Sequence, residues 1–369
     1  MLQIVASGFV QSIEFTPHDT KWMPSSARFV SCGITPGGKG ALSLFELGRG
    51  ELKTSLDCMS IHDNGIKCAT FGASSLEDRN LAFGDYNGGL CIWDIERCAS
   101  SSDGKGKCTL SGKSMEIFSV EAHNGIINAI DGVGGIDHEH GAPEIVTGGR
   151  DGCVKVWDPR VNNPVICLEP ENRTSRDCWT VAFGDSYNNE DRCVCAGFDN
   201  GDVKLFDLRT SSLRWESNCN NGVTSLEFDR KDIEMNKLVV TTLESKFRCY
   251  DMRTQHPSNG FTHLDESAHR STIWLARHLP QNRDIFMTCG GNGGLNIYAY
   301  HYPKKRVEKH INDKKSIGVV GNVELLNSRV IATQPIVCFD WNPNRAGLCC
   351  MGCLDQSLRV YIVTKLDKY

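Results

Sequence analysis

The sequence lacks any long hydrophobic run: no apolar stretch approaches the roughly 20 residues that a membrane-spanning helix needs. Its first residues, MLQIVASGFVQSIEF, carry neither a basic segment nor a long apolar one, so we expect no secretory signal. Positive charge is also scarce, because 40 Lys and Arg stand against 45 Asp and Glu, a formal net charge of -5. Proteins that bind duplex nucleic acid need a basic face. We therefore expect neither a membrane nor a nucleic acid among its partners.

Cysteine, in contrast, is abundant, with 18 residues in a chain of 369. Most of them lie inside apolar runs, as Cys68, Cys91, Cys195 and Cys249 do. A free cysteine in such a run behaves as a small hydrophobic residue. Without an export signal, this use of cysteine predicts a reduced, cytoplasmic protein rather than a disulfide framework.

Internal repeats dominate the organisation of the chain. The segments GDYNGGLCIWD (84–94), GRDGCVKVWDPR (149–160) and GFDNGDVKLFDLR (197–209) align without gaps on their final aromatic residue. Four weaker copies follow the same pattern. The seven anchor residues are Phe45, Trp93, Trp157, Phe206, Tyr250, Tyr298 and Tyr361. Their spacings run from 44 to 64 residues, near the roughly 40–45 residues of one propeller repeat plus insertions.

Each repeat predicts a β-hairpin. The residues one and three positions before the anchor are apolar, as in Val154 and Val156, which indicates a strand. Five positions before the anchor, a glycine allows the positive φ of a tight turn. The five copies with this glycine have Gly40, Gly88, Gly152, Gly201 and Gly293. Another strand lies upstream, as in VTSLEF (223–228), and no helical period competes with these strands.

Seven copies of three or four strands predict an all-β fold, a single seven-bladed β-propeller over residues 1–369. The ring must close, because unpaired strand edges aggregate. We expect the strand near Leu2–Ala6, within a lead-in of residues 1–16, to complete the last blade. The blades are expected at 17–60, 61–115, 116–172, 173–218, 219–266, 267–330 and 331–369.

The anchors and turns resemble those of the WD-repeat family of β-propellers. Stretches outside the repeats, such as RDCWTVAFG (176–184) and YDMRTQHP (250–257), are similar to the WD-repeat axonemal dynein assembly factors within that family. This resemblance implies a cytoplasmic adaptor, monomeric by itself, with no catalytic activity and no cofactor. The implied partners are a co-chaperone complex of RuvB-like ATPases and prefoldin-like subunits, and the axonemal dynein chains that it pre-assembles for the cilium. A link to apoptosis also attaches to the family.

Catalytic and metal sites find little support in the residue pattern. His62, His123 and His269 each precede the first strand of a blade, where a histidine can hydrogen-bond the turn aspartate, as His123 would with Asp151. The pairs Cys193-x-Cys195 and Cys350-x-x-Cys353 lie on predicted strands of different blades. A structural zinc site needs two such pairs to meet in a tetrahedron. We expect neither a catalytic residue nor a metal.

Function is therefore expected on one rim of the propeller, where the loops into the innermost strands meet the hairpin turns. The second residue of each innermost strand forms a predicted ring: His18, Lys67, Asn128, Trp179, Thr224, Trp274 and Val337. The residue before the turn aspartate or asparagine adds Tyr86, Arg150 and Asp199 to this rim. Trp, Tyr and Arg dominate protein interfaces. Trp179 and Trp274 have an alternative interpretation, as core residues packed between neighbouring blades.

A second function stays open because Asp-x-Arg follows the anchor in three successive repeats. The arginines are Arg160, Arg209 and Arg253. The motif resembles the box by which WD-repeat substrate receptors contact the adaptor of a cullin–RING ubiquitin ligase. Its structural alternative is a local ion pair that closes the turn. The lysine-rich stretch 302–316 could contact an acidic client or RNA, but we expect a solvated loop between blades, and we expect a flexible tip at 101–108.

Overall fold

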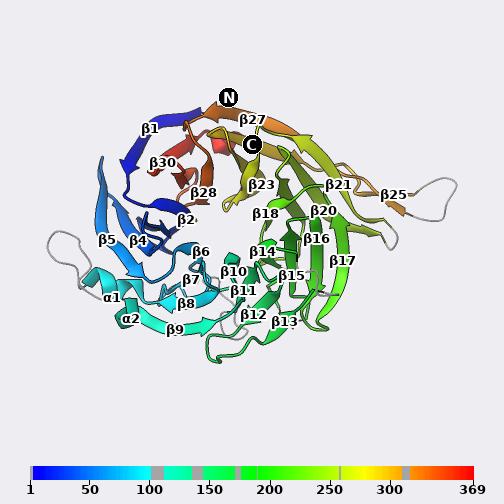
Figure 1. The fold of residues 1–369 in the computed structure, drawn as a ribbon. Coiled ribbons are helices and arrows are strands. Elements are labelled where there is room, and N and C mark those ends of the chain that lie inside the picture. The colour runs from blue at the N-terminus through cyan, green and yellow to red at the C-terminus, as the bar shows by residue number, and fades with distance from the viewer. Residues whose placement is uncertain are drawn as a thin grey trace.

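The computed structural model describes residues 3–100, 112–134, 144–170, 176–188, 190–256, 259–309 and 316–369. Within these residues the strands form seven four-stranded antiparallel sheets and one two-stranded sheet. The four-stranded sheets stand around a common axis as the blades of a propeller (Figure 1). The structure thus has the seven-bladed architecture that the repeats predict. None of its described helices is long and apolar enough to cross a bilayer.

In blades one to five the four strands follow in chain order from the axis outwards. Blades one and two contain β2 (Thr16–Trp22), β3 (Arg28–Ile34), β4 (Gly40–Leu47) and β5 (Leu52–His62), then β6 (Ile66–Thr70), β7 (Leu81–Asp85), β8 (Gly89–Trp93) and β9 (Glu116–Glu121). Blade three contains β10 (Ile127–Gly132), β11 (Ile145–Gly149), β12 (Val154–Trp157) and β13 (Ile166–Leu168). Blades four and five contain β14 (Cys178–Gly184), β15 (Cys193–Phe198), β16 (Asp202–Asp207) and β17 (Ser212–Asn218), then β18 (Val223–Phe228), β19 (Lys237–Thr242), β20 (Lys246–His256) and β21 (Gly260–Ser267).

Blades six and seven depart from this simple order. Blade six consists of β22 (Ile273–Leu279), β23 (Asn282–Gly290), β24 (Gly294–His301) and β27 (Asn322–Val330), with the hairpin of β25 (Val307–Lys309) and β26 (Ser316–Gly318) inserted before its last strand. Blade seven consists of β28 (Ile336–Trp341), β29 (Leu348–Cys353), β30 (Ser357–Thr364) and β1 (Gln3–Ser12). Two short helices, α1 (Ile95–Ser100) and α2 (Gly112–Met115), lie between β8 and β9, and a 3-10 turn spans Leu366–Lys368.

The N-terminal strand closes the ring as predicted. β1 pairs antiparallel with β30, so that Gln3 lies opposite Thr364 and Ser12 opposite Ser357. The strand is longer than the predicted 2–6, of which Leu2 lies outside the described residues, and its register shifts between Val5 and Phe9. Gly8 lies in this irregular segment, where a Cβ would stand 2.6 Å from the ring of Tyr361. A glycine is required there because the backbone crosses directly over the anchor of the last repeat.

The repeat pattern also predicts where the anchors lie and how the turns are built. All seven anchor aromatics lie on the third strand of their own blade, between the second strand and the outermost one. In six blades the residue five positions before the anchor has a positive φ, namely Gly88, Gly152, Gly201, Ser245, Gly293 and Gln356. Gly40 does not, because β4 already begins there; Gly38, with φ 79°, makes the turn of blade one instead. The turn prediction is therefore wrong at Gly40, where the hairpin loop is longer.

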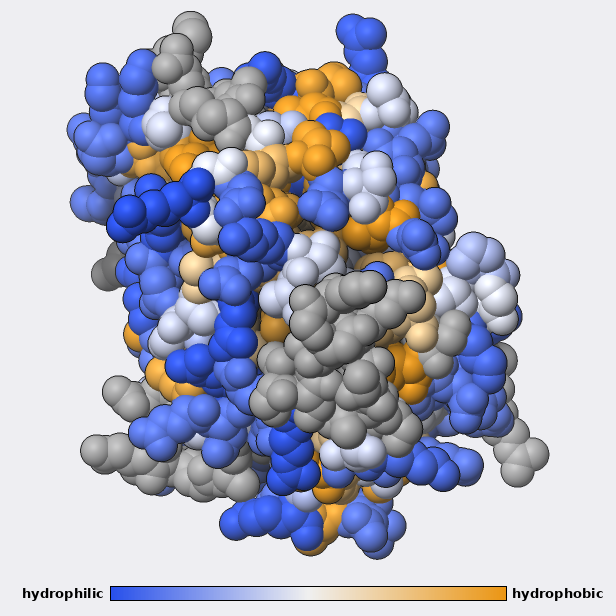
Figure 2. All heavy atoms as spheres, turned by 90° about the vertical axis from the view of Figure 1, so that its left-hand side faces the viewer, coloured by the Kyte–Doolittle hydropathy of each residue, from blue (hydrophilic) through white to orange (hydrophobic). Residues whose placement is uncertain are grey.

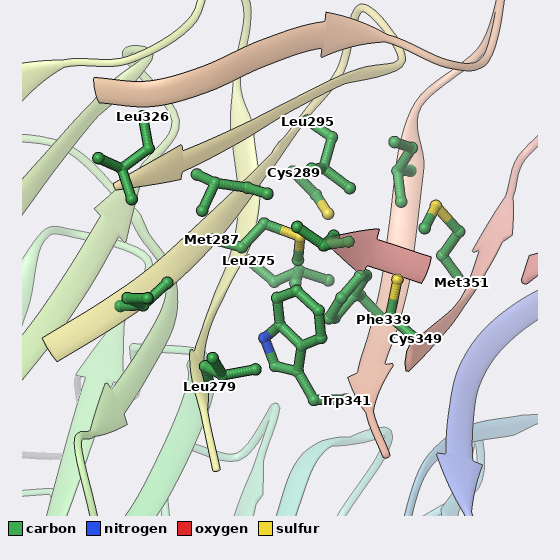
Figure 3. Packing of buried hydrophobic residues seen from close by; sticks show 14 of the residues in the cluster. Leu275, Leu279, Met287, Cys289, Leu295, Leu326, Phe339, Trp341, Cys349 and Met351 are labelled. Carbon is green, nitrogen blue, oxygen red and sulfur yellow. The ribbon is translucent and has the colours of Figure 1, made fainter. Parts of the chain in front are cut away.

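The core lies between the blades rather than within a single sheet. Figure 3 shows the largest cluster, in which Trp341 and Phe339 of β28 reach between Leu275, Leu279 and Met287 of blade six. Every cysteine whose side chain the structure describes is a free thiol, and most are buried in these layers. On the side where blades one and two face the viewer in Figure 2, hydrophilic residues cover most of the described surface and hydrophobic ones show between them.

Two expectations about the blades need correction, and one lies outside the described residues. The boundary at 115/116 is wrong, because β9 (Glu116–Glu121) pairs with β8 and so completes blade two. The basic stretch 302–316 is not simply a solvated loop. Its tyrosine, Tyr302, is bonded to Asp284 at 2.9 Å, and the β25–β26 hairpin contacts β20 of blade five. The tip expected at 101–108 lies outside the described residues.

Candidate functional site

All seven predicted ring residues occupy one structural position, a β-bulge at the start of the innermost strand. In each blade the register between the first and second strands shifts, and one residue is left without a partner on the second strand. The unpaired residues are His18, Lys67, Asn128, Trp179, Thr224, Trp274 and Val337. A bulge re-aims a side chain away from the regular alternation of a strand. The chain thus presents one such side chain per blade at the same end of the propeller, which we call the ring face.

Several ring residues bridge neighbouring blades. The Tyr86 hydroxyl of blade two lies 2.9 Å from Nε2 of His18 in blade one. Asn128 in blade three donates from Nδ2 to the carbonyl of Cys178 in blade four, at 3.1 Å. The hydroxyl of Thr224 in blade five donates to the carbonyl of Ile273 in blade six. Such bonds hold adjacent blades in register at the ring face, so the surface is preformed.

The two ring tryptophans have different environments. The Trp179 ring is partly buried against Gly222, at which a Cβ would lie 2.8 Å from Cζ3 of the indole, on the loop into blade five. Trp274 is the more open of the two, with 37% of its surface exposed. The packing interpretation therefore applies in part to Trp179, whereas Trp274 stands on the surface.

The residues at the turns add charge to this face. The Arg150 side chain is 64% exposed, and its Nε lies 3.9 Å from Oδ2 of Asp177, on the loop into blade four. Asp199 is partly buried, and its Oδ1 has no hydrogen-bond partner within the described part of the chain. Lys67, on β6 of blade two, is partly buried. The ring face thus combines an exposed tryptophan and an exposed arginine with a partly buried lysine and aspartate.

One residue of the ring face, His18, has a lowered pKa. Burial, together with the positive charge of Lys67, lowers the pKa of His18 to about 4. Burial also lowers the pKa of His269, at the loop into blade six, to about 4, although a hydrogen bond with Thr288 acts in the opposite direction. Both imidazoles are therefore neutral in the folded protein at neutral pH.

We expect this difference to make the protein less stable in mild acid. An unfolded histidine has a pKa near 6.5, so between about pH 6.5 and about pH 4 the unfolded chain binds more protons than the folded one. The contribution of each neutral histidine is thus complete above about pH 6.5 and is lost as the pH falls toward 4. In urea titrations, the double variant His18→Gln/His269→Gln should lose less unfolding free energy between neutral and mildly acidic pH than the wild type. Identical pH dependence of the two proteins would contradict the assignment.

The histidines that could suggest catalysis hold turns in place. His123 Nδ1 lies 2.9 Å from Oδ1 of Asp151, and its Nε2 lies 2.7 Å from the hydroxyl of Thr147. Trp157 Nε1 donates to the same hydroxyl at 2.9 Å, so one chain of bonds links the turn to the anchor. Burial opposes the charge on Asp151, but hydrogen bonds from His123 and backbone amides lower its pKa to about 2. The predicted His123–Asp151 bond is confirmed.

The other candidate histidines have comparable roles. His62 Nε2 lies 2.9 Å from Oδ2 of Asp85 at the turn of blade two. His269 bonds the hydroxyl of Thr288 on β23, at 2.8 Å. Among the described residues, no group of three or more His, Cys, Asp or Glu side chains could hold a metal ion. Cys193 and Cys195 lie fully buried on β15, and Cys350 and Cys353 lie buried on β29.

The Asp-x-Arg motifs lie at the opposite end of the propeller: the first follows β12, the second begins at the last residue of β16, and the third lies within β20. In all three, the first aspartate accepts a hydrogen bond from the backbone amide of the arginine. The guanidinium of Arg160 donates to Asp158 of the same motif, with Nε 3.0 Å from Oδ1, whereas Arg253 pairs with Glu234. Arg209 is exposed. The motif therefore closes turns, and it leaves the Arg160 and Arg209 side chains at the surface.

Sequence reasoning missed two arginines at this opposite end. Arg283 on β23 and Arg306 after β24 lie with Arg253 around one hollow. Arg306 belongs to the basic stretch 302–316, for which the sequence predicts a solvated loop and therefore no packed side chain. No signal in the sequence singles out Arg283, because only the closing of blade six against blade five brings it there.

Residues 105–367 match the family described as nucleolar protein 10-like, N-terminal domain, a β-propeller. The chain is 51% identical to the Homo sapiens protein named dynein axonemal assembly factor 10, over 99% of this chain and 98% of that protein. The proteins of the same name from Xenopus tropicalis and Chlamydomonas reinhardtii are 53% and 47% identical, over 96% and 97% of this chain and 95% and 96% of their own lengths.

Among solved structures, the WD40 β-propeller domain of Doa1 superposes with a TM-score of 0.67. The match covers 100% of this chain and 99% of that one, at 12% identity. At that identity the likeness shows the fold and nothing more.

Proposed function

The chain belongs to the dynein axonemal assembly factor 10 family of WD-repeat propellers, and on that premise we propose that it is a non-catalytic adaptor in the cytoplasmic pre-assembly of axonemal dynein arms. In this role it works with a co-chaperone complex of RuvB-like ATPases and prefoldin-like subunits, and it contacts dynein chains before they enter the cilium. It needs no cofactor, and it acts as one copy.

One observation carries the proposal: the seven bulged side chains on the ring face. They place two indoles, an imidazole, a lysine and an amide at equivalent positions around the axis. Hydrogen bonds between blades fix several of them, and a preformed surface loses little entropy when a partner binds. Among the described residues, His62 and His123 are bonded to turn aspartates, and His269 is bonded to Thr288 on β23. This arrangement suits recognition of a protein surface.

The proposal is tested by affinity purification of the tagged full chain from ciliating cells, with mass spectrometry of what is recovered. We expect RuvB-like ATPases, prefoldin-like subunits and axonemal dynein chains above the level of an untagged control. Their absence from a folded, abundant bait would contradict the proposal.

We expect the double variant Trp179→Ala/Arg150→Ala to weaken this recovery while it remains folded. Truncation of interface hot spots costs about 2 kcal/mol or more each, so recovery of the co-chaperone subunits should fall by about tenfold or more. Because Trp179 also packs on Gly222, the melting temperature of the double variant is measured in parallel. The exposed pair Trp274→Ala/Arg150→Ala provides a second variant that disturbs packing less. Unchanged recovery with both variants would place the partner elsewhere.

The alternative function is a substrate receptor of a cullin–RING ubiquitin ligase. It is favoured by the exposed Arg160 and Arg209 side chains, which stand at equivalent positions of blades three and four. Recovery of a cullin adaptor, abolished by Arg160→Ala/Arg209→Ala but not by the ring variants, would support this function. Arg253 is less suited to such a contact because Glu234 already pairs with it.

A further inference from the structure

Residues of blades five and six line an open hollow of about 600 Å³, at the end of the propeller opposite the ring face. Its walls come from three places in the chain: the segment before β19, with Glu234 and Asn236; the end of β20, with Arg253; and the blade-six segments that carry Arg283 and Arg306. The ring residues Thr224 and Trp274 lie at the N-terminal ends of β18 and β22. The segments that line the hollow lie at the opposite end of the propeller, toward which the C-terminal ends of β18 and β22 point. The hollow and the ring face are therefore separate surfaces.

Arg306 is held in position before any ligand arrives. Its guanidinium lies over the Tyr302 ring, 4.5 Å from the centroid, and its Nη1 donates to Oδ1 of Asn236 at 2.7 Å. Tyr302 is in turn bonded to Asp284 and to the buried Lys237. A guanidinium stacked on an aromatic ring keeps its remaining donors in a fixed fork. Arg306 thus presents a preorganised cation at the wall of the hollow.

The other two arginines leave the hollow with an excess of positive charge. Arg253 pairs with Glu234, whose side chain is 57% exposed. Arg283 is partly buried and makes no hydrogen bond or ion pair with any residue that the structure describes. Asp251, which lies 3.3 Å from Arg306 Nη1, is buried and does not line the hollow. Arg253 is thus paired with Glu234 and Arg306 with Asp251, and Arg283 is the arginine of these walls that has no carboxylate partner among the described residues, in a chain whose net charge is -5.

We propose that this hollow binds an acidic peptide segment of a partner protein, through pairs between its arginines and the carboxylates of that segment. Arginine matches a carboxylate with two parallel hydrogen bonds, and such charge-assisted pairs are the stronger ones. Because the rest of the chain is acidic, an acidic segment is repelled elsewhere and is directed to this hollow. A nucleic acid is disfavoured, because its phosphates require an extended basic groove with aromatic side chains for stacking. The inference does not depend on the ring face, nor on which complex the protein serves.

The test is direct binding of a short fluorescein-labelled polyglutamate peptide to the purified full chain, measured by fluorescence anisotropy. A polyglutamine peptide of equal length is the neutral comparison. We expect the acidic peptide to bind, the neutral one not to bind, and affinity to fall with added salt. Arg283→Glu should weaken binding by about tenfold or more, since it removes one charge-assisted pair and adds a repulsion.

Arg49→Glu is the matched control, because Arg49 is exposed on blade one and the substitution changes net charge equally. It should alter affinity by less than about twofold. Arg253→Glu, on a different strand, gives a second variant should Arg283→Glu fold poorly. Equal losses in Arg49→Glu and in the hollow variants, binding of the neutral peptide, or no binding of the acidic one would each overturn the proposal. Binding of a phosphoserine peptide alone would overturn the assignment to carboxylates. Because the readout is a purified peptide, a loss of partners from the ring face leaves this result unchanged.

Discussion

A chain that lacks residues 1–12 will not form the stable, monomeric propeller. The deletion removes β1, leaving β30 as an open edge, and it removes Phe9 from the cluster that contains the buried Leu358 and Val360. Loss of a fully buried aromatic side chain costs about 3–5 kcal/mol; the partly buried Phe9 accounts for part of such a loss, and the missing strand adds its ladder of hydrogen bonds. We expect unfolding free energy to fall by at least about 4 kcal/mol, with aggregation through the exposed edge. Urea denaturation and light scattering measure both effects.

A circular permutant provides the matched control. Because Gln3 lies opposite Thr364, residues 1–12 can follow the C-terminus through a short glycine–serine linker and form an ordinary hairpin with β30. The permutant, whose chain begins at Ile13, should recover most of the lost stability. A deletion variant as stable and monomeric as the wild type would show that the ring does not need this closure.

Substitution of Lys237 by alanine should destabilise the protein strongly, although no surface changes. Lys237 begins β19 with its side chain fully buried, and its Nζ lies 3.5 Å from Oδ2 of the fully buried Asp229 and 3.0 Å from Oδ1 of Asp284. Breaking a buried pair from one side leaves an uncompensated charge, which costs about 3–5 kcal/mol. The melting temperature and the unfolding free energy of Lys237→Ala measure this loss.

The control variant is Lys246→Ala, because Lys246 starts the next strand of the same blade with an exposed side chain. Its unfolding free energy should lie within about 0.5 kcal/mol of the wild type. Asp229→Asn in the Lys237→Ala background should recover part of the loss, since it removes the stranded negative charge and keeps an oxygen that can accept from the backbone amide of Lys237. A Lys237→Ala variant that is as stable as Lys246→Ala would contradict the buried ion pair.

The fold could be predicted from the sequence because each blade repeats the same local signals. The anchors, the positive-φ turns and the alternation of apolar residues depend on neighbours within one hairpin, which a single sequence displays. The outer strands are harder: β9 falls in the wrong predicted blade because α1, α2 and residues 101–111 separate it from β8. Pairing across such an insertion depends on which sheet has a free edge, and no local pattern records that.

The candidate surfaces could be predicted only in part. The ring residues can be found by counting from the start of each innermost strand, because this count needs only the sequence. The bulges that re-aim them, and the difference between Trp179 and Trp274, depend on contacts with the next blade. The hollow at the opposite end could not be predicted, because Arg253, Arg283 and Arg306 converge only when blades five and six pack.

Complementation tests the central claim, recognition through the ring face, most directly. In a Chlamydomonas reinhardtii strain without its own assembly factor 10, whose product is 47% identical to this chain, axonemal dynein content is measured after expression of the wild type, Trp274→Ala/Arg150→Ala or Arg49→Glu. We predict that the wild type and Arg49→Glu restore dynein arms, and that the ring variant, equally abundant and folded, does not. Full restoration by the ring variant would contradict the account.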